Sequence, residues 1–531
     1  MAKRPNFLLF INDQHRADHL GCYGNDIVRT PHIDSIATLG ERFDHFYVAT
    51  PICMPNRSTL MTGRMPSLHG SRHNGIPLSL SATTFVDILA AGGWRTALIG
   101  KCHLQSMSDA KPTLGMPDVD PKDVLAPFEL READKTILGH GRYDQELRNK
   151  WSNDPGQEID LPYYGFQHVD LCSGHGDKVT GHYGRWMKDQ HPNPDQLVGP
   201  DNQLPGNTYS APQAWRTAVP EALYPTAYIA DRTCDWLDDH VASGGDEPFY
   251  IQCSFPDPHH PFTPPGKYWD MYDPDEIPLP PSYNSNRELP AHLAALLSAR
   301  DDGSANKSGQ RAIGVSEQEA REAIALTYGQ IAMIDDRIGQ VLAKLHELGL
   351  AEDTVVIFTT DHGDFMGDHQ LLLKGALHYQ GLVRVPFIWA DPQSAEAGQT
   401  RDDLCGTLDI ASTVLDRAGL APHNGIQGRS LIKPGDPDRP VVIEEHQRRG
   451  YMGFENGFRA RTLVTRRYRL TVYDNREGFG ELYDLENDPL EQVNLFADQD
   501  SRDLRHALTE QLLHRLIALA ETSPLATNHG P

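Results

Sequence analysis

The sequence has few cysteines, few positive charges and no long apolar run, and each shortage excludes a class of protein. Its 531 residues contain seven cysteines, at positions 22, 53, 102, 172, 234, 253 and 405, without a C-x-x-C pair. An odd, scattered set is typical neither of a disulfide framework nor of a thiolate zinc site, and it favours a reducing compartment. Lys and Arg number 48 against 73 Asp and Glu, a formal charge of −25. This charge excludes a general nucleic-acid binder, because neutralising phosphates requires an excess of cations.

No stretch approaches the roughly 18 apolar residues of a membrane span. The first apolar run, Phe7–Ile11, is also too short for the core of a signal peptide. We therefore expect a cytoplasmic protein with neither a membrane nor a nucleic acid as partner. Hydrophobic residues make up 39% of the chain, which is enough apolar surface for a large folded core.

Short apolar runs rich in β-branched and aromatic residues alternate with helical patterns. This alternation predicts an α/β fold with a mostly parallel central sheet and helices on both faces. The predicted strands are Phe7–Ile11, Phe43–Ala49, Thr96–Ile99, Phe249–Phe255 and Thr354–Thr359. Apolar residues at helical spacing predict one long helix over about 316–348 and a shorter one over about 408–418.

Residues 1–435 are predicted to form the catalytic domain. Two stretches within it, about 104–222 and 266–312, are rich in turn residues and weakly periodic, so we interpret them as insertions. After residue 435 the pattern changes to strand and turn, which predicts a C-terminal subdomain over 436–531. Its predicted elements are antiparallel strands at 441–444, 458–465, 468–473 and 480–483 and a helix around 504–519. That helix could serve a homo-oligomer or simply face solvent.

Reactive side chains follow the predicted strands, where ligands bind in open α/β sheets. Asp13 and Gln14 follow the first strand, and Asp361 and His362 follow the fifth. Two carboxylates, an amide oxygen and an imidazole suit a divalent ion such as Ca²⁺ or Mn²⁺, with Zn²⁺ as a further option. Either pair taken alone could instead cap a helix.

Further reactive groups follow the other three strands: Cys53 with Arg57, Lys101 with His103, and His259. A thiol at the start of a helix meets the positive end of the helix dipole, which favours an anionic nucleophile or a bound oxyanion. The alternative for Cys53 is an inert buried thiol. Lys101 and His103 are two residues apart, so in an extended segment they point to the same side and can share one anion.

The segment Cys53-Met-Pro55-Asn-Arg57, followed by Thr62-Gly63, resembles the C-x-P-x-R motif of type I sulfatases within the alkaline phosphatase superfamily. Asn56 stands where that family usually has serine. Similar blocks recur along the chain: Gly100-Lys101-Cys-His103-Leu104, Pro258-His259-His-Pro261, Asp361-His-Gly-Asp364 with Lys374, and Glu481–Pro489 near the end.

The resemblance implies a metal-dependent hydrolase of sulfate monoesters. Its nucleophile would be formylglycine, which a maturation enzyme makes from Cys53 and which also binds the metal. The resemblance implies these roles: Asp13, Gln14, Cys53, Asp361 and His362 as metal ligands, Arg57 positioning the nucleophile, and Lys101, Lys374, His259 and Asn74 in contact with the substrate. We expect His259 to act on the leaving group and His103 to act as the base, or the reverse.

Two alternatives stay open. Asp13-Gln14 and Asp361-His362 resemble the phosphonate monoester hydrolase branch, which predicts phosphonate monoesters or phosphodiesters as substrates of the same site. The other alternative is a non-catalytic metal- and anion-binding protein with an unmodified Cys53. In each case the expected ligand is a small anion. Because the chain as a whole is acidic, a cationic pocket would attract this anion at short range only.

Overall fold

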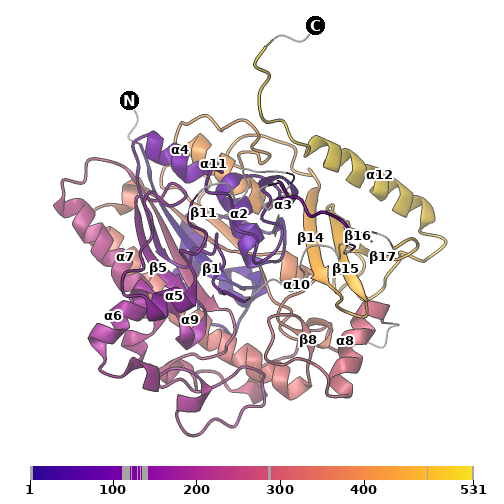
Figure 1. Ribbon diagram of the computed structural model, residues 1–531, viewed down its shortest axis with the longest axis horizontal. Helices are drawn as coiled ribbons and strands as arrows, with labels where there is room; N and C mark the ends of the chain where they lie inside the picture. Colours follow the sequence, from indigo (N-terminus) through magenta and orange to yellow (C-terminus); the bar gives the residue numbers. More distant parts are fainter. Residues whose placement is uncertain are drawn as a thin grey trace.

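The computed structural model describes residues 4–110, 120, 122–127, 130–131, 133, 141–284, 289–474 and 476–528. A mixed nine-stranded sheet lies at its centre (Figure 1). In spatial order the strands are β12 (Gln399–Arg401), β2 (Glu41–Phe43), β11 (Phe387–Ala390), β9 (Thr354–Thr360), β1 (Asn6–Asp13), β7 (Phe249–Pro258), β4 (Arg95–Gly100), β5 (His168–Ser173) and β6 (Thr180–Gly181). The inner strands β9, β1, β7, β4 and β5 run parallel.

Helices cover both faces of this sheet because its inner strands are apolar on both sides. On β1, Leu8 and Phe10 belong to one core and Phe7 and Leu9 to the core on the opposite face. The covering helices are α1 (Pro31–Leu39), α6 (His182–Gln190), α7 (Pro225–Ala242) and α9 (Glu317–Glu347) on one face, and α2 (Cys53–Thr62), α4 (Phe85–Ala91) and α11 (Ile410–Arg417) on the other. The predicted α/β class is confirmed.

Four of the predicted central strands are confirmed as β1, β4, β7 and β9. The prediction of one strand over 43–49 was wrong, because a turn at residues 44–45 splits the segment. Its first part is β2, and its second part is β3 (Phe46–Tyr47), which pairs with β13 (Cys405–Gly406) outside the central sheet. Strand β5 was not predicted, because polar residues interrupt its apolar pattern.

The long helix α9 begins at a capping box, in which the side chains and backbone amides of two residues bond reciprocally. Glu319 N donates to Ser316 Oγ at 3.2 Å, and Ser316 N donates to the Glu319 carboxylate at 2.9 Å. The predicted helices at 316–348 and 408–418 are confirmed as α9 and α11. Other described elements are α3 (Pro66–His69), α5 (Arg148–Asn153), α8 (Ala291–Asp301), α10 (Gln380–Val383), β8 (Ile313–Gly314) and β10 (Leu371–Leu372).

A four-stranded antiparallel sheet follows, as the sequence predicts, and Figure 1 shows α12 lying across it. Its elements are β14 (Val441–Arg449), β15 (Asn456–Val464), β16 (Tyr468–Tyr473), β17 (Gly480–Asp484) and α12 (Arg502–Ala518). One face packs on α12, whereas Phe458 and Tyr483 on the other belong to the same core as α2. The domain boundary at residue 435 stays a prediction. Among the described helices, none combines the length and apolarity that crossing a membrane requires.

Gly100 ends β4 and directs Lys101 out of the sheet. Its φ of +110° favours glycine, and a Cβ there would lie 1.9 Å from the carbonyl oxygen of Ser254 on β7.

We expect Gly100→Ala to reduce the free energy of unfolding by about 2 kcal/mol more than Gly244→Ala. Gly244 is the matched control, because it has a φ of +112° with no atom near its missing Cβ. Urea unfolding of both variants measures the difference, and equal losses would contradict the steric explanation.

Candidate active site

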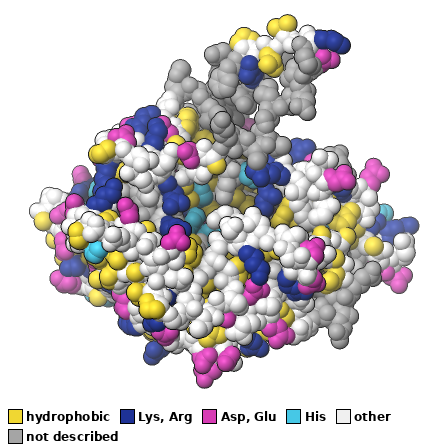
Figure 2. Space-filling model, turned by 60° about the horizontal axis from the view of Figure 1, so that its bottom comes forward, with side chains coloured by type: hydrophobic (Ala, Val, Ile, Leu, Met, Phe, Trp, Pro, Cys, Tyr) yellow, Lys and Arg dark blue, Asp and Glu magenta, His cyan; other side chains and the backbone are white. Residues whose placement is uncertain are grey.

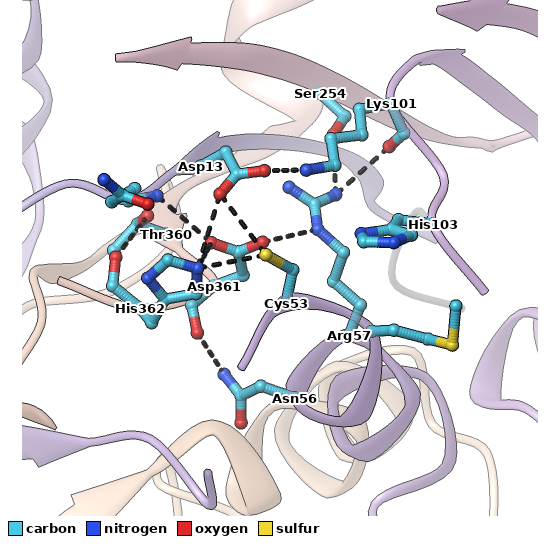
Figure 3. A network of polar contacts seen from close by, with 12 residues as sticks. Asp13, Cys53, Asn56, Arg57, Lys101, His103, Ser254, Thr360, Asp361 and His362 are labelled. Atoms are coloured by element: carbon cyan, nitrogen blue, oxygen red, sulfur yellow. Dashed lines mark hydrogen bonds and ion pairs between the residues drawn. The ribbon is translucent and has the colours of Figure 1, made fainter. Parts of the chain in front are cut away.

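The ends of four parallel strands bring reactive side chains to one buried cluster (Figure 3). Asp13 ends β1, Lys101 follows β4, His259 follows β7, and Asp361 with His362 follows β9. The first turn of α2 adds Cys53 and Arg57. The sequence prediction that these residues meet at one edge of the sheet agrees with this geometry, although α2 supplies Cys53 without a central strand before it.

Cys53 is the first residue of α2 and lies at the centre of the cluster. Lys374 Nζ donates to its Sγ at 2.8 Å, and His362 Nε2 and Asp13 Oδ1 lie 3.1 Å and 3.7 Å from Sγ. Burial raises the pKa of the Cys53 thiol despite the opposing charge of Lys374. Without a metal ion, the surroundings of the unmodified thiol therefore favour its protonated form, which is the weaker nucleophile, and not the anion expected at a helix start.

Arg57 and Asn56 attach this helix to Asp361. Arg57 Nε donates to Asp361 Oδ2 at 2.7 Å, and its Nη1 donates to Lys101 O and to Ser254 Oγ. The Asn56 amide donates to Asp361 O at 2.6 Å and accepts from Ala49 N at 3.1 Å. Asn56, which replaces the usual serine of the resembling motif, is thus fully bonded. Arg57 contacts the metal-ligand candidate Asp361 and the exit of β4.

The oxygen and nitrogen atoms around Cys53 fit a divalent ion. The ligand atoms of Asp13, Cys53, Asp361 and His362 all lie within 4.8 Å of one another. Within the described part of the chain, Gln14 Oε1 is buried and has no hydrogen-bond partner, because the amide nitrogen is the atom that contacts His260 and Asp364. A cation would satisfy this oxygen.

The tautomer and charges of this set are fixed by its neighbours. His362 Nδ1 donates to Gly363 O at 2.8 Å, so Nε2 carries the lone pair, which accepts from Lys374 Nζ at 3.0 Å and is the candidate ligand atom. Burial, reinforced by the charge of Lys374, lowers the pKa of His362 to about 3, so the ring is neutral. Burial alone would raise the pKa of Asp361, but the Arg57 guanidinium holds it below the usual range. A neutral imidazole beside an ionised carboxylate is the state that binds metals.

His175 belongs to this cluster and was missed by the sequence analysis. Its Nε2 lies 2.8 Å from Lys101 Nζ, which also contacts the Asp13 carboxylate. The ring stacks on His259 with centroids 3.7 Å apart, and His259 Nε2 lies 3.0 Å from Lys374 Nζ. His175 lies two residues beyond the end of β5. Its position after a strand could have identified it as a site residue, but β5 itself was not predicted.

His103 and Asn74 lie at the border of the cluster. The backbone amides of residues 103–105 donate to the buried carboxylate of Glu146, a second residue that sequence reasoning missed. In Figure 3 the His103 ring lies beside Arg57, and its buried Nδ1 has no partner among the described residues. Asn74 is exposed, and its Oδ1 accepts from Met54 N at 3.2 Å, one residue from Cys53.

Comparison with known proteins places these residues in a family context. A family model described as Sulfatase matches residues 5–420, and one described as the C-terminal part of N-sulphoglucosamine sulphohydrolase matches residues 367–517. An arylsulfatase of Clostridium perfringens is 28% identical, covering 97% of this chain and 94% of that protein. A choline-sulfatase of Rhizobium meliloti is 23% identical, with coverages of 93% and 82%.

Among solved structures, the phosphonate monoester hydrolase of Agrobacterium radiobacter has the same fold. It superposes with a TM-score of 0.75 at 25% identity, covering 98% of this chain and 97% of that one.

The metal-ligand set yields a prediction. We expect Asp13→Asn to weaken binding of Ca²⁺ or Mn²⁺ at least about tenfold, because an amide replaces a charged ligand. Calorimetric titration of chelator-treated protein measures the affinity. Asp391→Asn is the control, because Asp391 is also buried and ionically paired, in this case with Arg417. Asp391 follows β11, and since β11 runs antiparallel to β9, it lies at the opposite edge of the sheet from Asp361. An Asp13→Asn variant with unchanged metal affinity would rule out this site.

Proposed function

The chain belongs to the sulfatase family, and from this premise we propose that it hydrolyses sulfate monoesters through formylglycine made from Cys53. The observation that carries the proposal is the position of Cys53 Sγ between Lys374 Nζ and His362 Nε2, at 2.8 Å and 3.1 Å. A nucleophile at this position would have a cation donor on one side and metal ligands on the other.

We propose that a maturation enzyme oxidises Cys53. Hydrated formylglycine supplies two hydroxyls, one to attack sulfur and one whose later deprotonation expels sulfate and restores the aldehyde. A divalent ion, Ca²⁺ or Mn²⁺ or else Zn²⁺, would be held by Asp13, Gln14, Asp361 and His362 and would polarise the sulfuryl oxygens. The protonated state of the unmodified thiol supports the need for this modification.

The remaining residues have proposed roles that follow from their contacts. Lys374 and Lys101 are the cations for the sulfuryl oxygens. Arg57 positions the nucleophile indirectly, through Asp361 and the exit of β4. His175 positions Lys101 and His259, because its ring contacts both. We assign the leaving-group contact to His259 and the base to His103, and Asn74 supports the backbone beside Cys53.

A second candidate function uses the same site on phosphonate monoesters or phosphodiesters. It is favoured by Gln14 and His362 in the metal set and by the likeness to a phosphonate monoester hydrolase. Turnover of an aryl sulfate and the matching aryl phosphonate monoester decides the order of preference. A larger kcat/KM for the phosphonate would reverse our ranking.

Mass spectrometry of the Cys53 peptide tests the nucleophile. In protein produced with a maturation enzyme we expect the lighter aldehyde, because oxygen replaces sulfur. Cys53→Ala should retain the thermal unfolding midpoint and lose activity by about 10³-fold or more. Cys234→Ala is the control, since Cys234 is a buried residue of α7 that packs in the core on one face of the central sheet. A thiol in an active preparation, or full activity in Cys53→Ala, would contradict the proposal. An unmodified thiol in a preparation without turnover would favour the binding protein.

Lys374→Ala separates anion binding from metal binding. We expect kcat/KM to fall about 10²- to 10³-fold, because a buried cation facing the sulfuryl group is lost. Metal affinity should change much less, since Lys374 is not a ligand. Steady-state kinetics and metal titration give the two values, with the exposed Lys433→Ala as the control. Equal losses of anion and metal affinity would show that Lys374 serves the metal set.

A further inference from the structure

Arg311 lies beside Lys374 and provides a second cation near the site. A parallel bridge pairs Arg311 with Lys374, and Ala312 N donates to Lys374 O at 2.6 Å. Paired residues of adjacent strands direct their side chains to the same face. Since the Lys374 side chain reaches Cys53, the Arg311 side chain lies on the cluster side of this segment.

The Arg311 guanidinium is held in place without using its hydrogen-bond donors. It stacks over Tyr451, with its central carbon 5.1 Å from the ring centroid. Tyr451 lies in the turn between β14 and β15 and donates its hydroxyl to Ala312 O at 3.0 Å. Across the described ranges of the chain, Arg311 makes no ion pair and no hydrogen bond through its side chain. Its donors are therefore available to a ligand.

A further basic side chain lies close to Arg311. Burial lowers the pKa of His73, and the charge of Arg311 lowers it further. The nearby acid Glu445 has other neighbours, since Gln447 donates to it at 2.7 Å and His378 lies 3.7 Å away. Together, Arg311 and His73 form what we call the basic rim.

The basic rim is connected to the nucleophile. His73 precedes Asn74, which accepts from the amide next to Cys53. On the face seen in Figure 2, histidine side chains are visible in a hollow, and Lys and Arg side chains gather on two sides of it. Burial lowers the pKa of Arg311, and the charge of Glu445 opposes this only in part. Among the described residues the half-buried guanidinium forms no ion pair that would offset its lost hydration, although the chain's net charge of −25 provides many acids. A ligand anion would supply that partner.

We propose that Arg311 binds a second anionic group of the substrate. The preferred substrates then carry a carboxylate or another sulfate besides the ester that is cleaved. The inference rests on the proposed function for the cleaved ester only, and the contact with the second group is independent of turnover. Arg is suited to this task because its planar fork binds carboxylate and sulfonate oxygens in pairs.

Binding of sulfonates, which are not hydrolysed, tests the inference without catalysis. Calorimetry compares benzenesulfonate, with one anionic group, to 3-sulfobenzoate and 1,3-benzenedisulfonate, with two. We expect the wild-type enzyme to bind at least one dianion about tenfold more tightly, and Arg311→Gln to lose most of that preference. The dianion that binds more tightly shows whether the second anionic group is a carboxylate or a sulfate. Arg502→Gln on α12 removes an equal charge from an exposed position and should retain the preference.

Equal affinities for the three sulfonates in the wild type, or an unchanged preference in Arg311→Gln, would overturn the inference. A kinetic comparison separates it from the proposed function. The ratio of kcat/KM for 3-carboxyphenyl sulfate to that for its methyl ester should fall about tenfold in Arg311→Gln. If the enzyme containing formylglycine cleaves neither ester, the proposed function is wrong, and the sulfonate preference still decides the role of Arg311.

Discussion

The buried ion pair between Arg57 and Asp361 is the constraint on which the rest of the site depends. Both side chains are almost fully buried, with Nε and Oδ2 2.7 Å apart. A buried charge is stable only if it is paired and hydrogen-bonded, so neither residue can be moved independently. The pair fixes the first turn of α2 against the end of β9. It therefore sets the distance from Cys53 to the candidate metal ligands.

Asp361 can hold α2 and also face the candidate metal ligands because its two carboxylate oxygens have different partners. Oδ2 accepts from Arg57, whereas Oδ1 accepts from Gln14 N at 3.2 Å and lies 3.6 Å from His362 Nε2. Its backbone carbonyl accepts from Asn56. A residue held at three points needs little rearrangement when a ligand binds, which is what electrostatic catalysis requires. Asn56, at the position where the resembling motif has serine, supplies one of these three bonds.

The sequence predicted four of the five inner strands and their reactive ends, because continuous apolar runs such as Phe7–Ile11 can only be buried on both faces. It failed where the pattern is ambiguous. Residues 43–49 are apolar enough for one strand, but Asp44 and His45 form a turn, and apolarity does not tell which sheet a strand joins. Strand β5 has His168, Asp170 and Ser173 within it, so its apolar signal is weak. His175 was missed for that reason alone.

The proposed function and the proposed role of Arg311 assign chemistry and selectivity to different parts of the fold. The proposed nucleophile, the candidate metal ligands and Lys374 lie at the edge of the central sheet, held by buried ion pairs that leave little freedom for change. Arg311 instead depends on Tyr451, in a turn of the C-terminal sheet that packs against Gly375. Loops tolerate substitution far better than buried charged clusters do. The turn between β14 and β15 can therefore vary the groups that border the site while the distances around Cys53 stay constant, which separates the choice of substrate from the reaction.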